Sequence, residues 1–567
     1  MTRPKITYAV ALSAALAVAL TSCSSDSDAG GKSSTGAAAA SPKAASAATD
    51  YNPQPYANLK DGGSYTTGGS FNGDDTQGNR WNVNASLTGS RIWAWYNPVA
   101  ITFSPAGEVQ INKDYFTSAT TKNVGTKQQL TITINPKAVY NDGTPIDWRS
   151  IQATWQVNSG KNKDLQIGGT QGFDQIESVV RGASAKQAVV TFKQPYAAWP
   201  GLFTSFINPK AATVANFNNA YSNKLQPSWG AGPFTVQSYD PNSKKIVFVR
   251  NPKWWGRKGK LDKRIYLDFA KSSAGINAFK NGQIDYTSLS TPEDINQVKG
   301  RSGTQLRKGG SPFEYYLFLN GKSPVLSDIV VRKALLGSVN RAEIAKIEFN
   351  GLDYSEPLPG SSVYYSFQKG YEDNVSKVLT FDPAQAGKDL DAAGWKPGKD
   401  GIREKGGKQL VVEYAVFDPE PIDKAVAGSL TAALKKVGIK VNLKVLPGEQ
   451  WASTINQNKF DLVLSGNRSL DPYGVTGLGT FYGSSNDSNI TRIGNAGIDK
   501  EIAAVSKISD PVAQQKQANA VEQKALKLYG VLPLFSGPST YSVKKGLANV
   551  GASIFLSPLP ETVGWQR

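Results

Sequence analysis

Apolar and polar residues alternate at several points along the chain, which is the pattern of half-buried β-strands. Residues 130–134 read Leu-Thr-Ile-Thr-Ile, and residues 439–445 place Ile, Val, Leu and Val at every second position. Short apolar runs at 189–192 and 246–249 are also typical of strands. The pattern therefore predicts strands in both halves of the chain.

Between these strands, apolar residues recur at the spacing of helices. Trp148, Ile151 and Trp155 share one face of a predicted helix, and Asp147 stands before it as a capping carboxylate. Another helix is predicted over about residues 421–437, where a glycine follows it. Helices and strands that alternate in this way predict an α/β fold with mixed sheets in more than one lobe.

The N-terminus has the pattern of a secretory signal. Arg3 and Lys5 precede a stretch over residues 6–20 that is almost wholly apolar or small, and too short to span a membrane. Thr21-Ser22-Cys23 follows, and residues 20–23 resemble the bacterial lipobox, in which the cysteine becomes the first residue and carries diacylglycerol. A single cysteine could instead be a small buried hydrophobe. Its place between a leader and a polar tail favours lipidation.

The segment after Cys23 has the composition of a tether. Residues 24 to about 50 are mostly Ser, Ala, Gly and Asp, without an aromatic or branched aliphatic side chain. Such a segment buries too little apolar surface to offset its chain entropy, and as a flexible coil it would span about 30 Å. The sequence predicts a signal peptide over 1–22, a lipidated tether over 23–54, and a position on the outer face of the bacterial cytoplasmic membrane.

The composition of the chain is typical of a globular protein. The full chain is 40% hydrophobic and 10% aromatic, and the length after residue 54 exceeds what one core supports, so two or three domains are expected. The formal net charge is +18. Nucleic-acid binding is one interpretation of this charge. However, the Lys and Arg residues are dispersed and the protein is exported, which favours a solvated basic surface near an anionic cell wall.

The chain contains no histidine, which excludes several kinds of active site. Ser-His-Asp and Cys-His nucleophile systems need a histidine, and the usual zinc sites need histidines or several cysteines, whereas this chain has one cysteine. Ser542 and Lys545 have the Ser-x-x-Lys spacing, but the partner motifs of that enzyme class are missing. A catalytic pair of carboxylates for glycoside hydrolysis is still an alternative, because such pairs are recognised by their geometry and not by their spacing in the sequence. We expect no enzyme activity, no cofactor, no metal and no nucleic-acid partner.

Seven segments between residues 141 and 395 carry a family resemblance. The most distinctive is Val249-Arg-Asn-Pro-Lys-Trp-Trp-Gly256, which follows Gly230-Ala-Gly-Pro-Phe234. The full series is 141–151, 230–234, 249–256, 261–263, 279–285, 328–341 and 381–395. In this order the segments resemble motifs of the family 5 extracellular solute-binding proteins, the peptide, opine and nickel receptors of ABC importers.

The resemblance implies two lobes around a cleft that close on a solute, a type II periplasmic-binding-protein-like fold. Lobe one would comprise 55–102, 216–315 and 531–567, with an inserted domain at 103–215, and lobe two would comprise 316–530. The chain would then cross between lobes near Asn320 and Leu532. We expect Gly230 and Gly232 to serve a chain reversal with unusual φ, and Trp254 and Trp255 to pack between lobes.

In the family's peptide receptors, a loop after a second-lobe strand contacts the peptide. Residues 460–464 resemble that strand and 465–473 that loop, but here the loop is shorter, lacks its Trp and has no carboxylate at the usual ammonium-binding place. Asp471 either contacts ligand or only forms a turn. Arg468 either binds an anion bidentately or is solvated or paired within the protein. The candidates in this loop are Ser465, Gly466, Asn467, Arg468, Ser469, Asp471 and Tyr473.

Aromatic residues supply the other candidates. Trp93 and Trp95 face the same way if residues 93–97 form a strand, and that face is either cleft or core. Phe417 follows a predicted strand and lies on a cleft-edge loop in the resemblance.

We predict a monomeric lipoprotein that captures a solute, most simply an oligopeptide, for the permease domains of an ABC importer. Opine-like compounds, oligosaccharides or metal chelates are alternatives within this class, and a carboxylate-dependent hydrolase is the alternative outside it.

Overall fold

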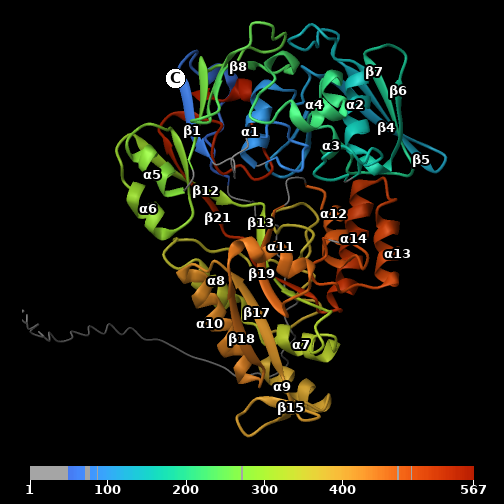
Figure 1. The fold of residues 1–567 in the computed structure, drawn as a ribbon, viewed down its shortest axis with the longest axis vertical. Helices are drawn as coiled ribbons and strands as arrows, with labels where there is room; N and C mark the ends of the chain where they lie inside the picture. The colour runs from blue at the N-terminus through green and yellow to red at the C-terminus, as the bar shows by residue number, and fades with distance from the viewer. Residues whose placement is uncertain are drawn as a thin grey trace, which may run out of the picture. The chain divides into compact units, whose positions relative to one another are not determined.

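Two large mixed sheets form most of the β-structure. The computed structural model describes residues 49–69, 77–85, 87–170, 172–269, 272–468, 472–486 and 488–567. Within these residues, seven strands form the first sheet. Its order is β12 (Thr304–Gly310), β21 (Pro538–Lys544), β11 (Tyr286–Leu289), β1 (Ser64–Gly69), β10 (Lys263–Asp268), β9 (Lys245–Arg250) and β8 (Phe234–Asp240). Strands distant in sequence therefore lie side by side (Figure 1).

The second large sheet has five strands among the described residues and packs around the most extensive apolar core. The strand order is β18 (Lys440–Leu446), β17 (Val411–Phe417), β19 (Leu462–Arg468), β13 (Phe313–Leu319) and β20 (Val531–Phe535). The predicted strand near residues 439–445 is confirmed as β18, which pairs parallel with β17.

A smaller antiparallel sheet lies within the segment that we assigned to an inserted domain. It consists of β4 (Phe116–Val124), β5 (Lys127–Ile134), β7 (Gln187–Phe192) and β6 (Ile176–Arg181). In β5, Leu130, Ile132 and Ile134 are buried at every second position, as the alternating sequence predicts. The short strands are β2 (Ile101–Phe103), β3 (Val109–Ile111), β14 (Lys396–Pro397), β15 (Arg403–Lys405), β16 (Lys408–Gln409), β22 (Leu547–Ala548) and β23 (Gly564–Trp565).

α2 begins at the predicted capping residue. The side chain of Asp147 accepts a hydrogen bond from the Arg149 N–H at the start of α2, and Asp382 caps α9 in the same way. Among the described residues, no helix is long and apolar enough to cross a membrane. The α-helices are α1 (Leu87–Tyr96), α2 (Trp148–Asn158), α3 (Trp199–Leu202), α4 (Val214–Asn219), α5 (Ser272–Lys280), α6 (Pro292–Val298), α7 (Ile329–Gly337), α8 (Arg341–Glu348), α9 (Pro383–Ala392), α10 (Pro421–Lys436), α11 (Trp451–Asn456), α12 (Val475–Tyr482), α13 (Ala496–Val505) and α14 (Pro511–Leu526).

The chain crosses between the two large sheets at two places, and both differ from the prediction. It leaves β12 at Gly310 and enters β13 at Phe313, then leaves β20 at Phe535 and enters β21 at Pro538. Residues 313–315 and 531–535 thus belong to the five-stranded sheet, although we assigned them to lobe one. The crossings lie at 310–313 and 535–538 rather than near Asn320 and Leu532, because β13 and β20 pair with each other.

The predicted tether also ends earlier than residue 54. The backbone N–H of Asp50 donates to the carbonyl of Ala552, and the Ala552 N–H donates back, both at 2.9 Å. The Val550 N–H donates to the carbonyl of Tyr51 at 2.9 Å. Residues 50–54 are therefore fixed to the C-terminal segment. Cys23 and residues 24–48 lie outside the described residues.

The two motif glycines allow a close backbone approach rather than an unusual φ. Gly230 has φ −74°, and Gly232 is not among the described glycines with positive φ. A Cβ at Gly230 would overlap the Tyr96 carbonyl oxygen. A Cβ at Gly232 would lie 2.8 Å from the Tyr96 carbonyl carbon and 2.9 Å from the Trp95 oxygen. The motif therefore fits the C-terminal end of α1.

Trp254 and Trp255 join the first sheet to the smaller one. Their ring centres lie 4.4 Å apart, and both rings pack on Tyr115, at 5.4 and 5.7 Å. The Trp255 Nε1–H donates to the Asp114 carbonyl at 2.9 Å. They therefore pack between the first sheet and residues 103–215, and not between the two lobes as we expected, because both rings meet Tyr115.

Gly232→Ala should destabilise the protein by about 1–3 kcal/mol, the usual cost of overpacking, because the new methyl group meets backbone atoms that cannot rotate away. The matched control is Gly428→Ala on α10, where a Cβ would have no heavy atom within 4 Å. A helix-interior glycine replaced by alanine gains up to about 1 kcal/mol. Urea unfolding of both variants checks this, and equal stability of Gly232→Ala and the unmodified protein would contradict it.

Candidate functional site

A cavity of about 410 Å³ lies against the seven-stranded sheet. Strands β1, β10, β11 and β21 line it, together with α1, residues 98–103 and the C-terminal segment 549–563. Arg307, which is fully buried, donates hydrogen bonds to the carbonyl groups of Leu547 and Val550 and so holds the start of that C-terminal segment. A volume of this size is typical of small-molecule sites.

Arg264 of β10 is the most tightly held charge in the cavity wall. Its side chain is 3% exposed, and its guanidinium carbon lies 4.3, 4.8 and 5.1 Å from the ring centres of Tyr65, Tyr266 and Trp95. It donates to two backbone carbonyl groups and, at 2.6 Å, to the Thr67 hydroxyl. No described carboxylate forms a salt bridge with it, so carbonyl dipoles and ring faces hold the cation. Burial lowers the pKa of Arg264.

Two further arginines line the same cavity. Arg91 on α1 is exposed and interacts electrostatically with the hydroxyl groups of Tyr266, Tyr286 and Tyr541. Arg80 stacks on the neighbouring Trp81 ring, and burial lowers the pKa of Arg80 to about 10, so this side chain stays charged at neutral pH. Among the described residues that line the cavity, these three arginines are the only charged side chains.

The predicted tryptophans lie on a helix, not on a strand. Residues 87–96 form α1, so Trp93 and Trp95 point in different directions. Trp93 is fully buried and its Nε1–H donates to the Ser205 hydroxyl at 2.9 Å, whereas Trp95 packs edge-on against Phe234 at 5.2 Å. The expectation that they share one face was wrong, because a helix buried on several sides shows the same run of apolar residues as a strand. Both side chains still line the cavity.

A bridging aromatic cluster closes the cavity next to the C-terminal segment. It consists of Phe103, Tyr365, Phe367, Tyr473 and Phe555. Phe103 and Phe555 line the cavity, and their rings lie 6.1 Å from Tyr473 and 6.0 Å from Tyr365. The cluster therefore joins the cavity wall to segments that lie between strands of the five-stranded sheet. Of the predicted loop residues, Tyr473 is the one that the structure brings beside the cavity.

The other predicted contact residues lie away from the cavity or outside the described residues. Ser465, Gly466 and Asn467 belong to β19, which continues through Arg468 by pairing with β13, so the predicted loop begins later than we expected. Phe417 ends β17 and packs edge-on against Trp451 at 5.0 Å. None of these described side chains lines the cavity. The Arg468 side chain, Ser469 and Asp471 lie outside the described residues.

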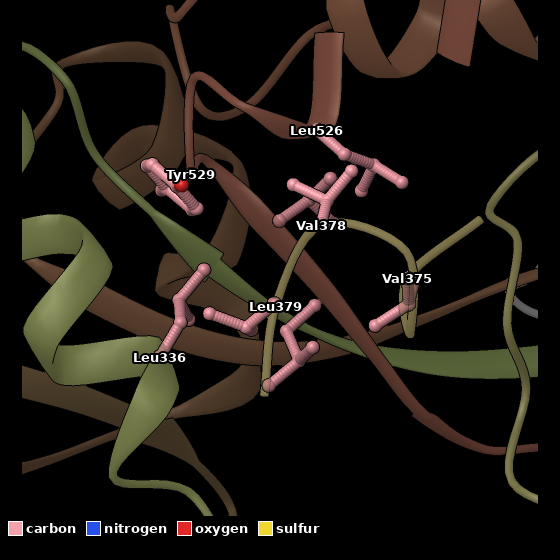
Figure 2. A pocket seen from close by; sticks show the side chains of 8 residues that line it. Leu336, Val375, Val378, Leu379, Leu526 and Tyr529 are labelled. Atoms are coloured by element: carbon pink, nitrogen blue, oxygen red, sulfur yellow. The ribbon is translucent and has the colours of Figure 1, made fainter. Parts of the chain in front are cut away.

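A second cavity lies inside the core of the five-stranded sheet. It measures about 10 Å³ and is lined by apolar side chains that include Leu336, Val378 and Leu526 (Figure 2). One water molecule needs about 10–15 Å³ and polar partners, so this space is a packing gap and not a solute site. Among the described residues, no group of three or more Cys, Asp and Glu is arranged to hold a metal ion.

Comparison with known proteins identifies the family. Residues 117–489 match the family model described as bacterial extracellular solute-binding proteins, family 5 Middle. The chain is 33% identical over 551 residues to the oligopeptide-binding protein OppA of Mycobacterium tuberculosis, an alignment that covers 95% of this chain and 90% of that protein. The chain belongs to the family 5 extracellular solute-binding proteins.

Solved structures confirm the predicted fold class. The periplasmic EDTA-binding protein EppA superposes with a TM-score of 0.82 at 23% identity, covering 92% of this chain and 98% of that one. The oligopeptide-binding protein AppA of Bacillus subtilis, solved with a nonapeptide, superposes with a TM-score of 0.68 at 17% identity, covering 90% and 100%. The fold is therefore the two-lobed α/β fold of periplasmic binding proteins.

In this solute-binding protein, sequence reasoning missed the three arginines of the cavity. Arg91 lies two residues before Trp93, and Arg264 directly follows the family segment 261–263, so both stood next to positions that we had noticed. What distinguishes these arginines is that no described carboxylate lines the cavity with them, and this becomes visible only when the strands and α1 are assembled. The C-terminal wall, residues 549–563, has no sequence pattern that predicts ligand contact.

The two crossings of the solute-binding protein are tied together by carboxylates. The Glu356 carboxylate accepts hydrogen bonds from the N–H groups of Ser536 and Gly537 in the second crossing. Glu314, just after the first crossing, is 2% exposed and accepts from the Tyr316 hydroxyl at 2.7 Å. Burial, with the charge of Glu356 nearby, raises the pKa of Glu314 to about 8.

The raised pKa of Glu314 predicts a stability loss as pH rises. The unfolded chain releases this proton near pH 4.5 and the folded protein near pH 8, so in between the folded state binds more protons and the free energy of unfolding falls, by up to about 1.4 kcal/mol per pH unit. In Glu314→Gln this contribution should vanish. Urea unfolding at a series of pH values between 5 and 8 measures the slope. The exposed Glu404→Gln controls for the loss of one negative charge, and identical slopes for Glu314→Gln and the unmodified protein would refute the assignment.

Proposed function

We propose that this solute-binding protein captures an oligopeptide outside the cytoplasm and delivers it to the permease domains of an ABC importer. The observation that carries the proposal is the likeness to OppA along almost the whole chain. A peptide needs apolar and aromatic surface for its side chains and polar groups for its backbone. The cavity beside α1 combines Trp93, Trp95 and Tyr65 with the hydroxyl groups of Tyr266 and Ser539.

The proposed peptide site extends from this cavity past the bridging aromatic cluster. The contact of Tyr473 with Phe103 at the cavity wall supports a contribution to the site from the five-stranded sheet. We keep Ser465, Asn467, Arg468 and Asp471 as proposed contacts, and Phe417 as a contact at the outer edge. Trp93 and Trp95, which line the cavity, are the proposed aromatic contacts from α1.

Solute capture requires a movement between the parts that carry the two large sheets. We propose that each sheet forms the core of one lobe, with the four-stranded sheet as an inserted domain, and that the crossings at 310–313 and 535–538 act as hinges. A solute that contacts both lobes favours the closed state by its difference in affinity for the two states. The protein acts as a monomer and performs no chemical step.

A bound peptide should stabilise the protein and reduce its radius of gyration. At a free concentration of 100 times Kd the gain is about 2.7 kcal/mol. Thermal unfolding with peptide pools finds a ligand, calorimetry gives its Kd, and X-ray scattering at saturation measures the radius. Mass spectrometry of the recovered peptide supplies the control, since an intact peptide excludes hydrolysis. An unchanged radius at saturation contradicts closure, and cleaved peptide contradicts a receptor without catalysis.

We also propose that Cys23 anchors the protein by a lipid at the outer face of the membrane. The thiol is the acylation site, so Cys23→Ser should release the protein into the medium or leave the uncleaved precursor. Cell fractionation with mass spectrometry of the N-terminus distinguishes these forms. Ser24→Ala, at the next position, should leave anchoring unchanged. A mature, lipid-modified Cys23→Ser protein in the membrane fraction would rule out this anchor.

A further inference from the structure

The cavity beside α1 carries an unbalanced positive charge. Arg80, Arg91 and Arg264 line it, while none of its described lining residues is Asp, Glu or Lys. The formal charge of the described wall is therefore +3. Protein surrounds these charges on several sides, so water and salt screen them less than they screen charges on an open surface. An anion that enters the cavity gains from all three cations, whereas a cation is repelled.

The sheet carboxylate that acts electrostatically on Arg264, Asp285, has its own partners. Asp285 accepts a hydrogen bond from the Thr66 N–H at 2.6 Å and forms a salt bridge with Lys544 at 2.6 Å. It is 5% exposed and does not line the cavity. Asp285 therefore acts on Arg264 only through its electrostatic field, and it forms its ion pair with Lys544 instead.

The arginines divide into a fixed cation and an accessible one. Arg264 is held by three hydrogen bonds to described groups and by three aromatic rings, so it contributes a permanent positive potential. Arg91 is exposed on α1 and faces Tyr266, Tyr286 and Tyr541. A guanidinium group has five N–H donors in a planar fork that matches a carboxylate. Arg91 can therefore contact an anion directly, with the tyrosine hydroxyl groups as further donors.

We propose that the cavity selects solutes with at least two carboxylates, bound by Arg91 and attracted by the potential of Arg264 and Arg80. This inference rests on the proposed function, within which the solute is an acidic oligopeptide. A neutral peptide with one terminal carboxylate would leave two of the three cations unpaired. A free polycarboxylate has the same chemistry without the peptide backbone, so the experiment includes both sources.

The test is calorimetry of the unmodified protein with four probes at low salt. The probes are Ala-Ala-Ala-Ala, Ala-Glu-Glu-Ala, Ala-Lys-Lys-Ala and tricarballylate. We expect Ala-Glu-Glu-Ala to bind at least tenfold more tightly than Ala-Ala-Ala-Ala, and Ala-Lys-Lys-Ala more weakly than both. The preference for the acidic peptide should shrink as salt rises, because salt screens charges that water reaches.

Variants locate the effect in the cavity. Arg91→Gln should weaken binding of Ala-Glu-Glu-Ala by about 10- to 100-fold, the scale of hydrogen bonds to a charged partner. Arg91→Lys should recover part of this loss, since an ammonium keeps the charge without the fork. Arg181→Gln is the matched control, because Arg181 is exposed on β6 of the four-stranded sheet and does not line the cavity.

The outcomes separate this inference from the proposed function. Equal affinity for the acidic and neutral peptides overturns the inference and leaves a peptide receptor standing. Binding of tricarballylate without any peptide supports the inference and overturns the peptide function. An acidic preference that Arg91→Gln leaves intact, with the variant folded by circular dichroism, overturns the role of the cavity, as does failure of both anionic probes to bind.

Discussion

The backbone of the two crossings is the constraint on which the rest of the structure depends. Among the described strands, the chain passes between the seven-stranded and five-stranded sheets at two connections, residues 310–313 and 535–538. A crossing cannot satisfy its N–H groups within a sheet, and buried unpaired groups are costly. Glu356 accepts from Ser536 and Gly537, and the Tyr365 hydroxyl donates to the Pro312 carbonyl at 2.8 Å. The same Tyr365 belongs to the bridging aromatic cluster, so one residue connects crossing and cavity wall.

The positive charges of the cavity reduce the stability of the folded protein. Burial disfavours the Arg264 cation, and the folded protein offsets this with carbonyl groups, the faces of three aromatic rings and the field of Asp285, without a described salt bridge to Arg264. A carboxylate within reach would hold the arginine more firmly, but it would also neutralise the cavity. An arrangement that keeps the cations unneutralised suits a site whose counter-charge arrives with the solute. Perturbed charges of this kind concentrate at functional sites for that reason.

Sequence reasoning recovered the elements whose pattern is local. β5, α2, α10 and β18 were predicted because their periodicity and their cap or terminating glycine lie within one segment. It failed at α1, where Ile92, Trp93, Trp95 and Tyr96 are all buried, because a helix enclosed on several sides loses its apolar stripe. The crossings were misplaced because the partner of a strand is set by register between distant segments. The arginine cavity depends on three such segments and could not be predicted from any one of them.

Residues 465–473 depart from the family pattern, and the packing around them explains part of this difference. β19 extends through Arg468 because it pairs with β13 over its whole length, and the Phe313 ring lies so close to Gly466 that a Cβ there would overlap it. A glycine is therefore required by packing at a position that resemblance assigned to ligand contact. Strand pairing fixes the backbone of Ser465 and Asn467 as well. In our proposal the five-stranded sheet thus supplies shape and closure through Tyr473, while the charge of the solute is recognised from the opposite wall, by side chains of α1 and β10.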